Sequence, residues 1–128
     1  MQEEAENRIT NQINMHVEEK NAKEEIIEIT EKCIKCGLCK ELCPVFRVLR
    51  EEQSSPRGHA ILLSNKIYDK ILFDCTLCKA CEEKCPMNLK LCTAIKKARQ
   101  VMNLKDKEHP KNKDIVKKIS EKKNPFSN

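Results

Sequence analysis

The chain of 128 residues is poor in the residues that build ordinary cores and nucleotide-binding loops. It has no Trp, one Tyr and three Phe, although aromatic side chains usually supply the largest pieces of buried apolar area. Its two Gly residues are too few for a glycine-rich phosphate loop or a dinucleotide-binding fingerprint. The longest apolar run, residues 60–63, is far too short for a transmembrane helix. We therefore expect non-protein material to replace part of the core.

The chain also lacks the sequence signs of secretion and of catalysis. Residues 1–6 have neither the basic nor the apolar region of a secretory signal, so we expect a cytoplasmic protein. In that compartment the nine Cys residues are expected to bind metal rather than to form disulfides. No acid–base pair suited to catalysis stands out, and no catalytic residue is predicted.

Charge is distributed unevenly, although the net charge is only +5. Residues 1–31 carry a net charge of −6, residues 32–87 of +3 and residues 88–128 of +8. A basic tail can indicate nucleic-acid binding, but we interpret this one as the solvated face of a helix. Metal-bound thiolates would offset the positive charge of the middle segment. No nucleic-acid partner is predicted.

Hydrophobic spacing predicts an all-α protein. Residues 3–30 are helix-prone, with Ile9, Ile13 and Val17 on one stripe and an expected interruption at Asn21. Because this stripe is narrow, the helix is either loosely docked or available to a partner.

Three further helices are expected after it. Ser55 followed by Pro56 predicts the start of the first, whose apolar face continues to Ile71 and leads to Cys75. The second covers residues 88–103, with Leu91, Ile95, Ala98 and Met102 on one face. His109-Pro110 ends that helix, and residues 112–121 form the last one.

The main feature of the sequence is an internal repeat of Cys residues. The segments 33–44 and 75–86 both place four Cys at steps of 3, 3 and 4 residues, followed by Pro. Such a loop can wrap one corner of an iron–sulfur cubane and point its N–H groups at sulfur. In two-cluster ferredoxins, the fourth Cys of each run ligates the other cluster. The predicted ligands are Cys33, Cys36, Cys39 and Cys85 for cluster one, and Cys75, Cys78, Cys81 and Cys43 for cluster two.

Zinc is the less favoured metal, because structural zinc sites usually use two separated Cys or Cys/His pairs. Cys92 is the ninth thiol, and we interpret it as a small buried hydrophobe on a helix. The alternative is a redox-active thiol or a ligand of a partner's cluster.

The two runs differ in detail. Gly37 can adopt a positive φ in the tight loop, whereas its counterpart is Lys79. Thr76 can hydrogen-bond a cluster sulfur and its counterpart Ile34 cannot, so we expect clusters with different potentials. The three His residues are interpreted as solvent-exposed or capping side chains: His16, His59 and His109.

The two Cys runs, with Ser55-Pro56-Arg57-Gly58 between them, resemble the α-helical two-cluster ferredoxin domain of certain iron–sulfur subunits. These subunits belong to glycolate oxidase, lactate-utilisation enzymes and heterodisulfide reductases. Residues 112–126 are similar to the segment that follows this domain in heterodisulfide-reductase-like proteins. The resemblance implies an all-α ferredoxin domain with two 4Fe–4S clusters. We place it at residues 31–103, between helical extensions at 1–30 and 104–128.

The resemblance also implies a role. It predicts an electron-transfer subunit between a flavin-bearing subunit and a second redox centre, with any membrane association made through a partner. Many relatives continue into CCG domains, whose chemistry is expected on another polypeptide or is absent. Arg57 and Gly58 are expected to let a helix start approach a cluster, with Arg57 offsetting negative charge. A free ferredoxin-like carrier and a zinc-binding nucleic-acid adaptor remain as alternatives.

Overall fold

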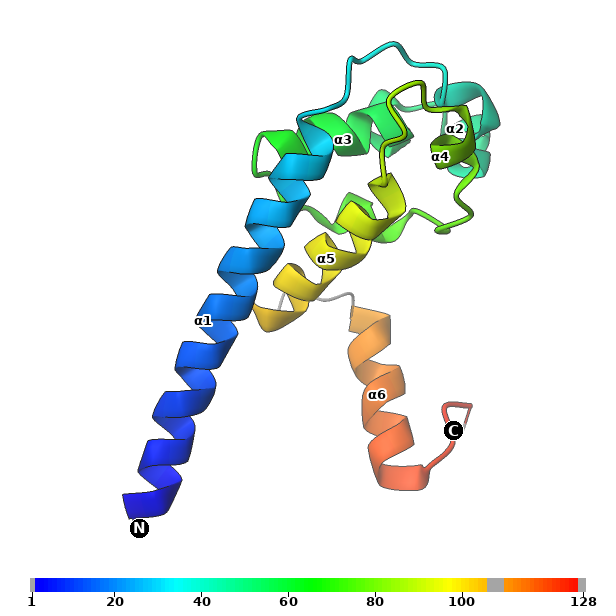
Figure 1. Ribbon diagram of the computed structural model, residues 1–128. Coiled ribbons are helices and arrows are strands. Elements are labelled where there is room, and N and C mark those ends of the chain that lie inside the picture. The colour runs from blue at the N-terminus through cyan, green and yellow to red at the C-terminus, as the bar shows by residue number, and fades with distance from the viewer. Residues whose placement is uncertain (1, 106–109, 127–128) are drawn as a thin grey trace.

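The computed structural model describes residues 2–105 and 110–126, and all regular secondary structure within these ranges is helical (Figure 1). The prediction of an all-α protein is therefore confirmed. In chain order the elements are α1 (Gln2–Thr30), η1 (Lys40–Leu42), α2 (Pro44–Leu49), η2 (Glu52–Ser54), α3 (Pro56–Ser64), η3 (Lys70–Phe73), α4 (Ala80–Lys84), α5 (Leu91–Leu104) and α6 (Pro110–Lys122). Across the described residues, no helix is both long and apolar enough to cross a bilayer.

Helix α1 is one continuous helix, so the predicted interruption at Asn21 is wrong. Ion pairs one turn apart, Glu19–Lys23 and the exposed pair Lys20–Glu24, flank that position and support the helix. On the other side Ala22 and Ile26 are buried against the rest of the molecule. Packing of this face outweighs the weak helix propensity of a single Asn.

The C-terminal half of α1 lies beside α5, whereas its N-terminal half projects past the end of α5 (Figure 1). Glu19 and Glu25 of α1 form ion pairs with Lys105 at 2.9 Å and Lys97 at 2.8 Å. These pairs fix the long helix along α5. The projecting half leaves Ile9 and Ile13 each 57% exposed.

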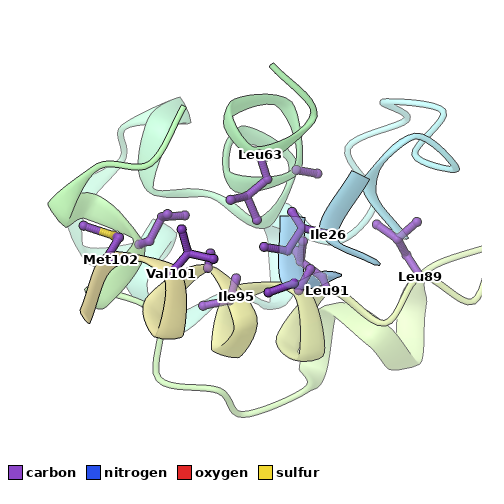
Figure 2. Packing of buried hydrophobic residues seen from close by; sticks show 12 residues of the cluster. Ile26, Leu63, Leu89, Leu91, Ile95, Val101 and Met102 are labelled. Atoms are coloured by element: carbon purple, nitrogen blue, oxygen red, sulfur yellow. The ribbon is translucent and has the colours of Figure 1, made fainter. Parts of the chain in front are cut away.

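The buried core consists of aliphatic side chains and one Met, as the scarcity of aromatics requires. It joins α1, α3, η3 and α5, and Figure 2 shows Ile26 between Leu63 of α3 and the apolar face of α5. Its members are Ala22, Ile26, Ala60, Leu63, Leu72, Leu89, Leu91, Ala94, Ile95, Ala98, Val101 and Met102. Four of the Cys residues pack against it: Cys33, Cys75, Cys81 and Cys85. The apolar interior thus continues into the Cys-rich end of the molecule.

The helix predicted to run from Pro56 to Ile71 is shorter than expected. Its start is confirmed, because the side chain of Ser55 accepts a hydrogen bond from Gly58 N at 3.0 Å. Its end is wrong, because α3 stops at Ser64 and Lys66 takes a left-handed φ of 60°. The Asp69 carboxylate then accepts from Ile71 N and starts the separate turn η3. This turn buries Leu72 and places η3 against η2.

The last two helices agree with the sequence pattern. Helix α5 buries the stripe of Leu91, Ile95, Ala98 and Met102. Helix α6 has no buried residue and stands apart from α1 and α5 in Figure 1. Its apolar residues remain exposed: Ile115, Val116 and Ile119. His109 lies outside the described residues.

Candidate metal centre

The two Cys runs fold into loops with the same backbone geometry. In the first loop Lys35 and Gly37 take positive φ values of 59° and 77°. The equivalent residues of the second loop, Leu77 and Lys79, take 57° and 63°. The positive φ predicted for Gly37 is confirmed, and the same conformation occurs where the sequence has no Gly. Each non-Gly residue held there costs roughly 1–2 kcal/mol, so the loop shape is imposed by what surrounds it.

The fourth Cys of each run also repeats its conformation. Cys43 has φ and ψ of −73° and 118°, and Cys85 has −70° and 119°. The Cys43 sulfur accepts from Phe46 N at 3.5 Å and caps α2, with Pro44 at the first helical position. Both residues are extended, which turns each side chain away from its own loop.

Two cavities form at this end of the molecule, and thiols line both. The first contains about 430 Å³ of empty space, open solvent included, and the second about 370 Å³. The thiols around the first cavity are Cys33, Cys36, Cys39, Cys81 and Cys85. Those around the second are Cys43, Cys75, Cys78, Cys81 and Cys92. Each fourth Cys therefore lies at the cavity of the other run.

The two cavities are neighbours. They share three lining residues, Pro56, Cys81 and Leu91. Pro56 begins α3 and Leu91 begins α5, so the starts of two helices form the wall between the cavities. The structure brings together all eight predicted ligands at one end of the fold, although the ligand assignment itself stays a prediction.

The chemistry of the donors fits iron–sulfur clusters. Thiolates are soft ligands, and the remaining walls are mostly apolar, as a cluster buried beside a core requires. Backbone N–H groups also point at sulfur, as in the 3.4 Å contact of Leu77 N with Cys75 Sγ. Within residues 2–105 and 110–126, no three Cys, His, Asp or Glu side chains converge on a position for a single ion.

Comparison with known proteins agrees with this geometry. Residues 29–89 match the family described as "4Fe-4S dicluster domain". This segment is a 4Fe–4S dicluster domain. The family implies two 4Fe–4S clusters, and electron transfer is what such clusters serve.

Several curated proteins share sequence with the dicluster domain and its flanks. The chain is 35% identical over 71 residues to a subunit of the H(2):CoB-CoM heterodisulfide,ferredoxin reductase of Methanothermobacter thermautotrophicus, covering 54% of this chain and 38% of that protein. It is 29% identical over 87 residues to the glycolate oxidase iron-sulfur subunit of Escherichia coli, covering 62% and 21%. It is 32% identical over 79 residues to lactate utilization protein B of Anoxybacillus flavithermus, covering 56% and 17%. Each match spans less than two fifths of the relative's own length.

Burial changes the thiol chemistry of the dicluster domain. It raises the pKa of Cys39, Cys75 and Cys81, and neighbouring thiols add to the effect. The N–H of Leu77 acts in the opposite direction on the pKa of Cys75. These thiols are neutral in the metal-free protein at pH 7, so binding of a cluster must release their protons.

Exposure differs within each run in the same way. The second Cys, Cys36 or Cys78, is exposed, and the other six predicted ligands are half-buried. Each cavity of the dicluster domain therefore approaches the surface at the middle of its loop.

The first turn of α3 makes a contact that the sequence did not predict. A Cβ atom at Gly58 would lie 1.9 Å from the carbonyl oxygen of Glu52, so this Gly permits close approach of η2 to α3. Approach of the helix start to a cluster stays a prediction. Arg57 does line the first cavity, as expected. Its guanidinium donates to Glu52 at 2.6 Å and to the carbonyl of Lys35 at 3.2 Å. Arg57 thus also holds the left-handed part of the first loop.

More polar side chains belong to the lining of the second cavity than to that of the first. Thr76 lines it, and the counterpart Ile34 lines the first cavity. Cys92 is 1% exposed on α5, which confirms a buried thiol, but it also lines the second cavity, which its position on the apolar stripe did not indicate. His16 is exposed as predicted, whereas the prediction for His59 is wrong, since it is buried and lines the second cavity.

Sequence reasoning missed Arg99 and Glu82. Arg99 of α5 donates to the carbonyl oxygens of Leu72 at 2.9 Å and Cys75 at 2.6 Å, and so anchors the second loop. The Glu82 carboxylate accepts a hydrogen bond from Cys92 N at 3.0 Å, and so provides a partner for one of the free N–H groups at the start of α5. No sequence pattern separates these two residues from the many other charged residues of a chain that is 35% charged. Their partners are apparent only in the tertiary fold.

Proposed function

We propose that the chain is an electron-relay subunit of an oxidoreductase complex, which connects a flavin-bearing subunit to a second redox centre. In this proposal one cluster is held by Cys33, Cys36, Cys39 and Cys85, and the other by Cys75, Cys78, Cys81 and Cys43. A reducing, cytoplasmic compartment would keep these thiols available.

The observation that carries the proposal is the pair of adjacent thiol-lined cavities. They share Pro56, Cys81 and Leu91, so no more than a single layer of side chains separates them at that point. A bound 4Fe–4S cluster accepts or donates one electron at a time. The arrangement therefore supports electron exchange between two sites that each approach the surface at a different loop, near Cys36 and near Cys78.

The proposal of a partner rests on exposed apolar surface at both ends. The stripe of Ile9, Ile13 and Val17 on α1 is 52–57% exposed, and the apolar residues of α6 are 43–53% exposed. Exposed apolar stripes usually mark interaction sites. The segment 1–31 is acidic and the segment 88–128 is basic, so the two ends suit partner surfaces of opposite sign. The named relatives are subunits of a heterodisulfide reductase and a glycolate oxidase, which supports a role within a multi-subunit oxidoreductase. A flavin-bearing or CCG-type subunit is the partner that we propose.

Cluster content is the first test. Anaerobic reconstitution of the full chain should give about eight iron and eight acid-labile sulfide per chain, with two separate one-electron reduction steps. Four iron atoms, or zinc in place of iron, would contradict the assignment of two clusters.

Partner docking is the second test. Ala22 and Ile26 are buried, so a truncation of α1 must end before them, at residue 18. Removal of residues 1–18 or 110–128 should leave eight iron atoms but reduce the flavin-containing subunit recovered with the natively purified chain. Ile9→Gln with Ile13→Gln is the matched test of the stripe, and Asn7→Gln with Asn11→Gln, at exposed uncharged positions, is its control on the same helix. Full recovery of the partner and full electron delivery with both ends removed would show that these ends are only solvated tails.

A further inference from the structure

Two residues that line the second cavity each have a buried polar atom without a hydrogen-bond partner. In the part of the chain that the structure describes, three buried side-chain atoms lack one: Ser54 Oγ, His59 Nε2 and Tyr68 OH. Ser54 and His59 both line the second cavity. An unsatisfied buried polar group costs about 1–3 kcal/mol, so such groups normally have a partner. The missing partner is expected inside this cavity.

Ser54 and His59 are held in place by different elements. Ser54 ends η2 and is 1% exposed, and His59 lies in the second turn of α3 and is 2% exposed. Gly58 fixes the spacing between these elements through its close approach to Glu52. Both side chains are therefore positioned by packing rather than by solvent.

Few groups in this cavity could accept a hydrogen bond. Besides Ser54 and His59, its polar side chains are Thr76, Lys79 and five Cys residues, and the rest of the lining is apolar. Lys79 is donor-only. A cluster with its thiolates is anionic and contains many sulfur acceptors, which need donors in a low-dielectric site. Sulfur is thus the acceptor that suits both orphaned groups.

The first cavity offers no equivalent. Arg57 is its one polar lining side chain apart from the Cys residues, and this guanidinium is already hydrogen-bonded to Glu52 and Lys35. The position one turn along α3 that faces this cavity is Ala60. Beyond Arg57, helix α3 therefore presents the ring of His59 to the second cavity and only the methyl group of Ala60 to the first.

We propose that Ser54 Oγ–H and His59 Nε2–H donate hydrogen bonds to sulfur atoms of the cluster held in the second cavity, and thereby raise its reduction potential. This inference rests on the proposed function, because it requires a cluster at that site. The proposal assigns the ring proton of His59 to Nε2. Hydrogen bonds to sulfur are one of the factors that set cluster potentials.

The test is a redox titration of the full chain with both clusters reconstituted, followed by electron paramagnetic resonance. Ser54→Ala and His59→Phe each remove one donor, and Ser54→Thr and His59→Gln restore one. Ser64→Ala on α3 and His16→Phe on α1 are the matched controls, since neither residue lines a thiol cavity. Cys78→Ala identifies the signal that belongs to the second cavity.

Each loss of a donor should make reduction of that cluster about tenfold less favourable, which is a shift of about 59 mV for one electron. The conservative variants should recover most of the shift, and the controls should show none. Unchanged potentials in Ser54→Ala and His59→Phe with eight iron atoms bound would overturn this inference alone. A shift confined to the signal that survives Cys78→Ala would also overturn it. Fewer than eight iron atoms in the unmodified chain would instead refute the proposed function.

Discussion

The two thiol-lined cavities are formed by loops of the same backbone conformation, but the side chains that line them differ. Their loops repeat the left-handed positions at Lys35 and Leu77, and their fourth Cys residues agree in φ and ψ to within 3°. Five thiols line each cavity. The other lining residues of the first cavity are apolar apart from Arg57, whereas those of the second include a Thr, a Ser, a His and a Lys, and one of its thiols, Cys92, lies outside both Cys runs. The repeated Cys positions thus set where the thiols lie, and the residues that differ between the runs or lie outside them set the surroundings of each site.

The largest expected effect is the loss of one cluster when a fourth Cys is removed. In the predicted crossed ligation, the fourth Cys of each run binds the cluster of the other run. Cys43→Ala should remove the same spectroscopic signal as Cys78→Ala, and Cys85→Ala the same signal as Cys36→Ala. The physical reason is that each fourth Cys lines the cavity of the other run. Iron should fall from about eight to about four atoms per chain. If Cys43→Ala instead removed the same signal as Cys36→Ala, all four Cys of a run would bind one cluster, and crossed ligation would be wrong.

Gly58→Ala should affect both sites, since Pro56, two residues earlier, lines both cavities. A Cβ atom there would lie 1.9 Å from the Glu52 carbonyl oxygen. Because this oxygen belongs to the backbone, the clash cannot be relieved by rotation of a flexible side chain. We expect the free energy of unfolding to fall by about 1–3 kcal/mol, as for overpacking. Chemical denaturation followed by cluster absorbance measures it. Ser64→Ala on the same helix, at a residue that lines neither cavity, is a control for increased helix propensity.

Cys92→Ala tests whether the second cavity uses a thiol from outside the Cys runs, for which the first cavity has no counterpart. Cys92 is 1% exposed and packs on the core side of α5, so the loss of sulfur should lower stability by about 1 kcal/mol. Because four other Cys residues line that cavity, iron content should stay at eight atoms. Iron analysis and thermal unfolding test both statements. Loss of iron in this variant would make Cys92 a ligand.

The sequence was sufficient to predict the features that depend on local patterns. The Cys repeat, the cap at Ser55 and the stripe on α5 all depend on short spacings, and the structure bears out the cap and the stripe. The extent of α1 and α3 was not predictable in this way. Packing of Ala22 and Ile26 carries α1 past Asn21, and a left-handed Lys66 ends α3 before the apolar pattern does.

The walls of the cavities were the least predictable part of the site. His59 and Cys92 look like ordinary helix residues in the sequence, because their neighbours do not reveal which side faces a cavity. Arg99 reaches the Cys75 carbonyl across 24 residues of chain. Contacts of this kind depend on the tertiary fold, and the composition of the segment 88–103 gives no sign of them.

An exchange of residues between the loops should give a smaller effect of opposite sign. Lys79 occupies the left-handed position that Gly37 occupies in the first loop. Lys79→Gly should stabilise the protein by about 0.5–1 kcal/mol, since relief of strain exceeds the entropy cost of Gly. Gly37→Lys should destabilise it by a similar amount, and its Cβ would also press on Arg57 Nη1 at 2.9 Å. Equal stability of both variants in denaturant titrations would show that the loops do not share this strain.

The smallest expected effect concerns Glu52, which faces the first cavity only through Arg57. Hydrogen bonds from Arg57 and then Lys40 lower the pKa of Glu52 from its ordinary 4.5 to about 2. A lowered folded-state pKa stabilises the fold above the ordinary value, and this contribution disappears as the pH falls from about 4.5 toward 2. The Glu52 side chain is 46% exposed, so solvent screening keeps its contribution below about 1 kcal/mol. Glu52→Gln should therefore lower the free energy of unfolding slightly at pH 7 and 0.05 M salt, and the difference should shrink at 1 M salt. Glu51→Gln, one residue away and exposed, is the matched control. A loss that persists unchanged at 1 M salt would mean that Glu52 acts through packing of η2 and not through charge on the wall of the first cavity.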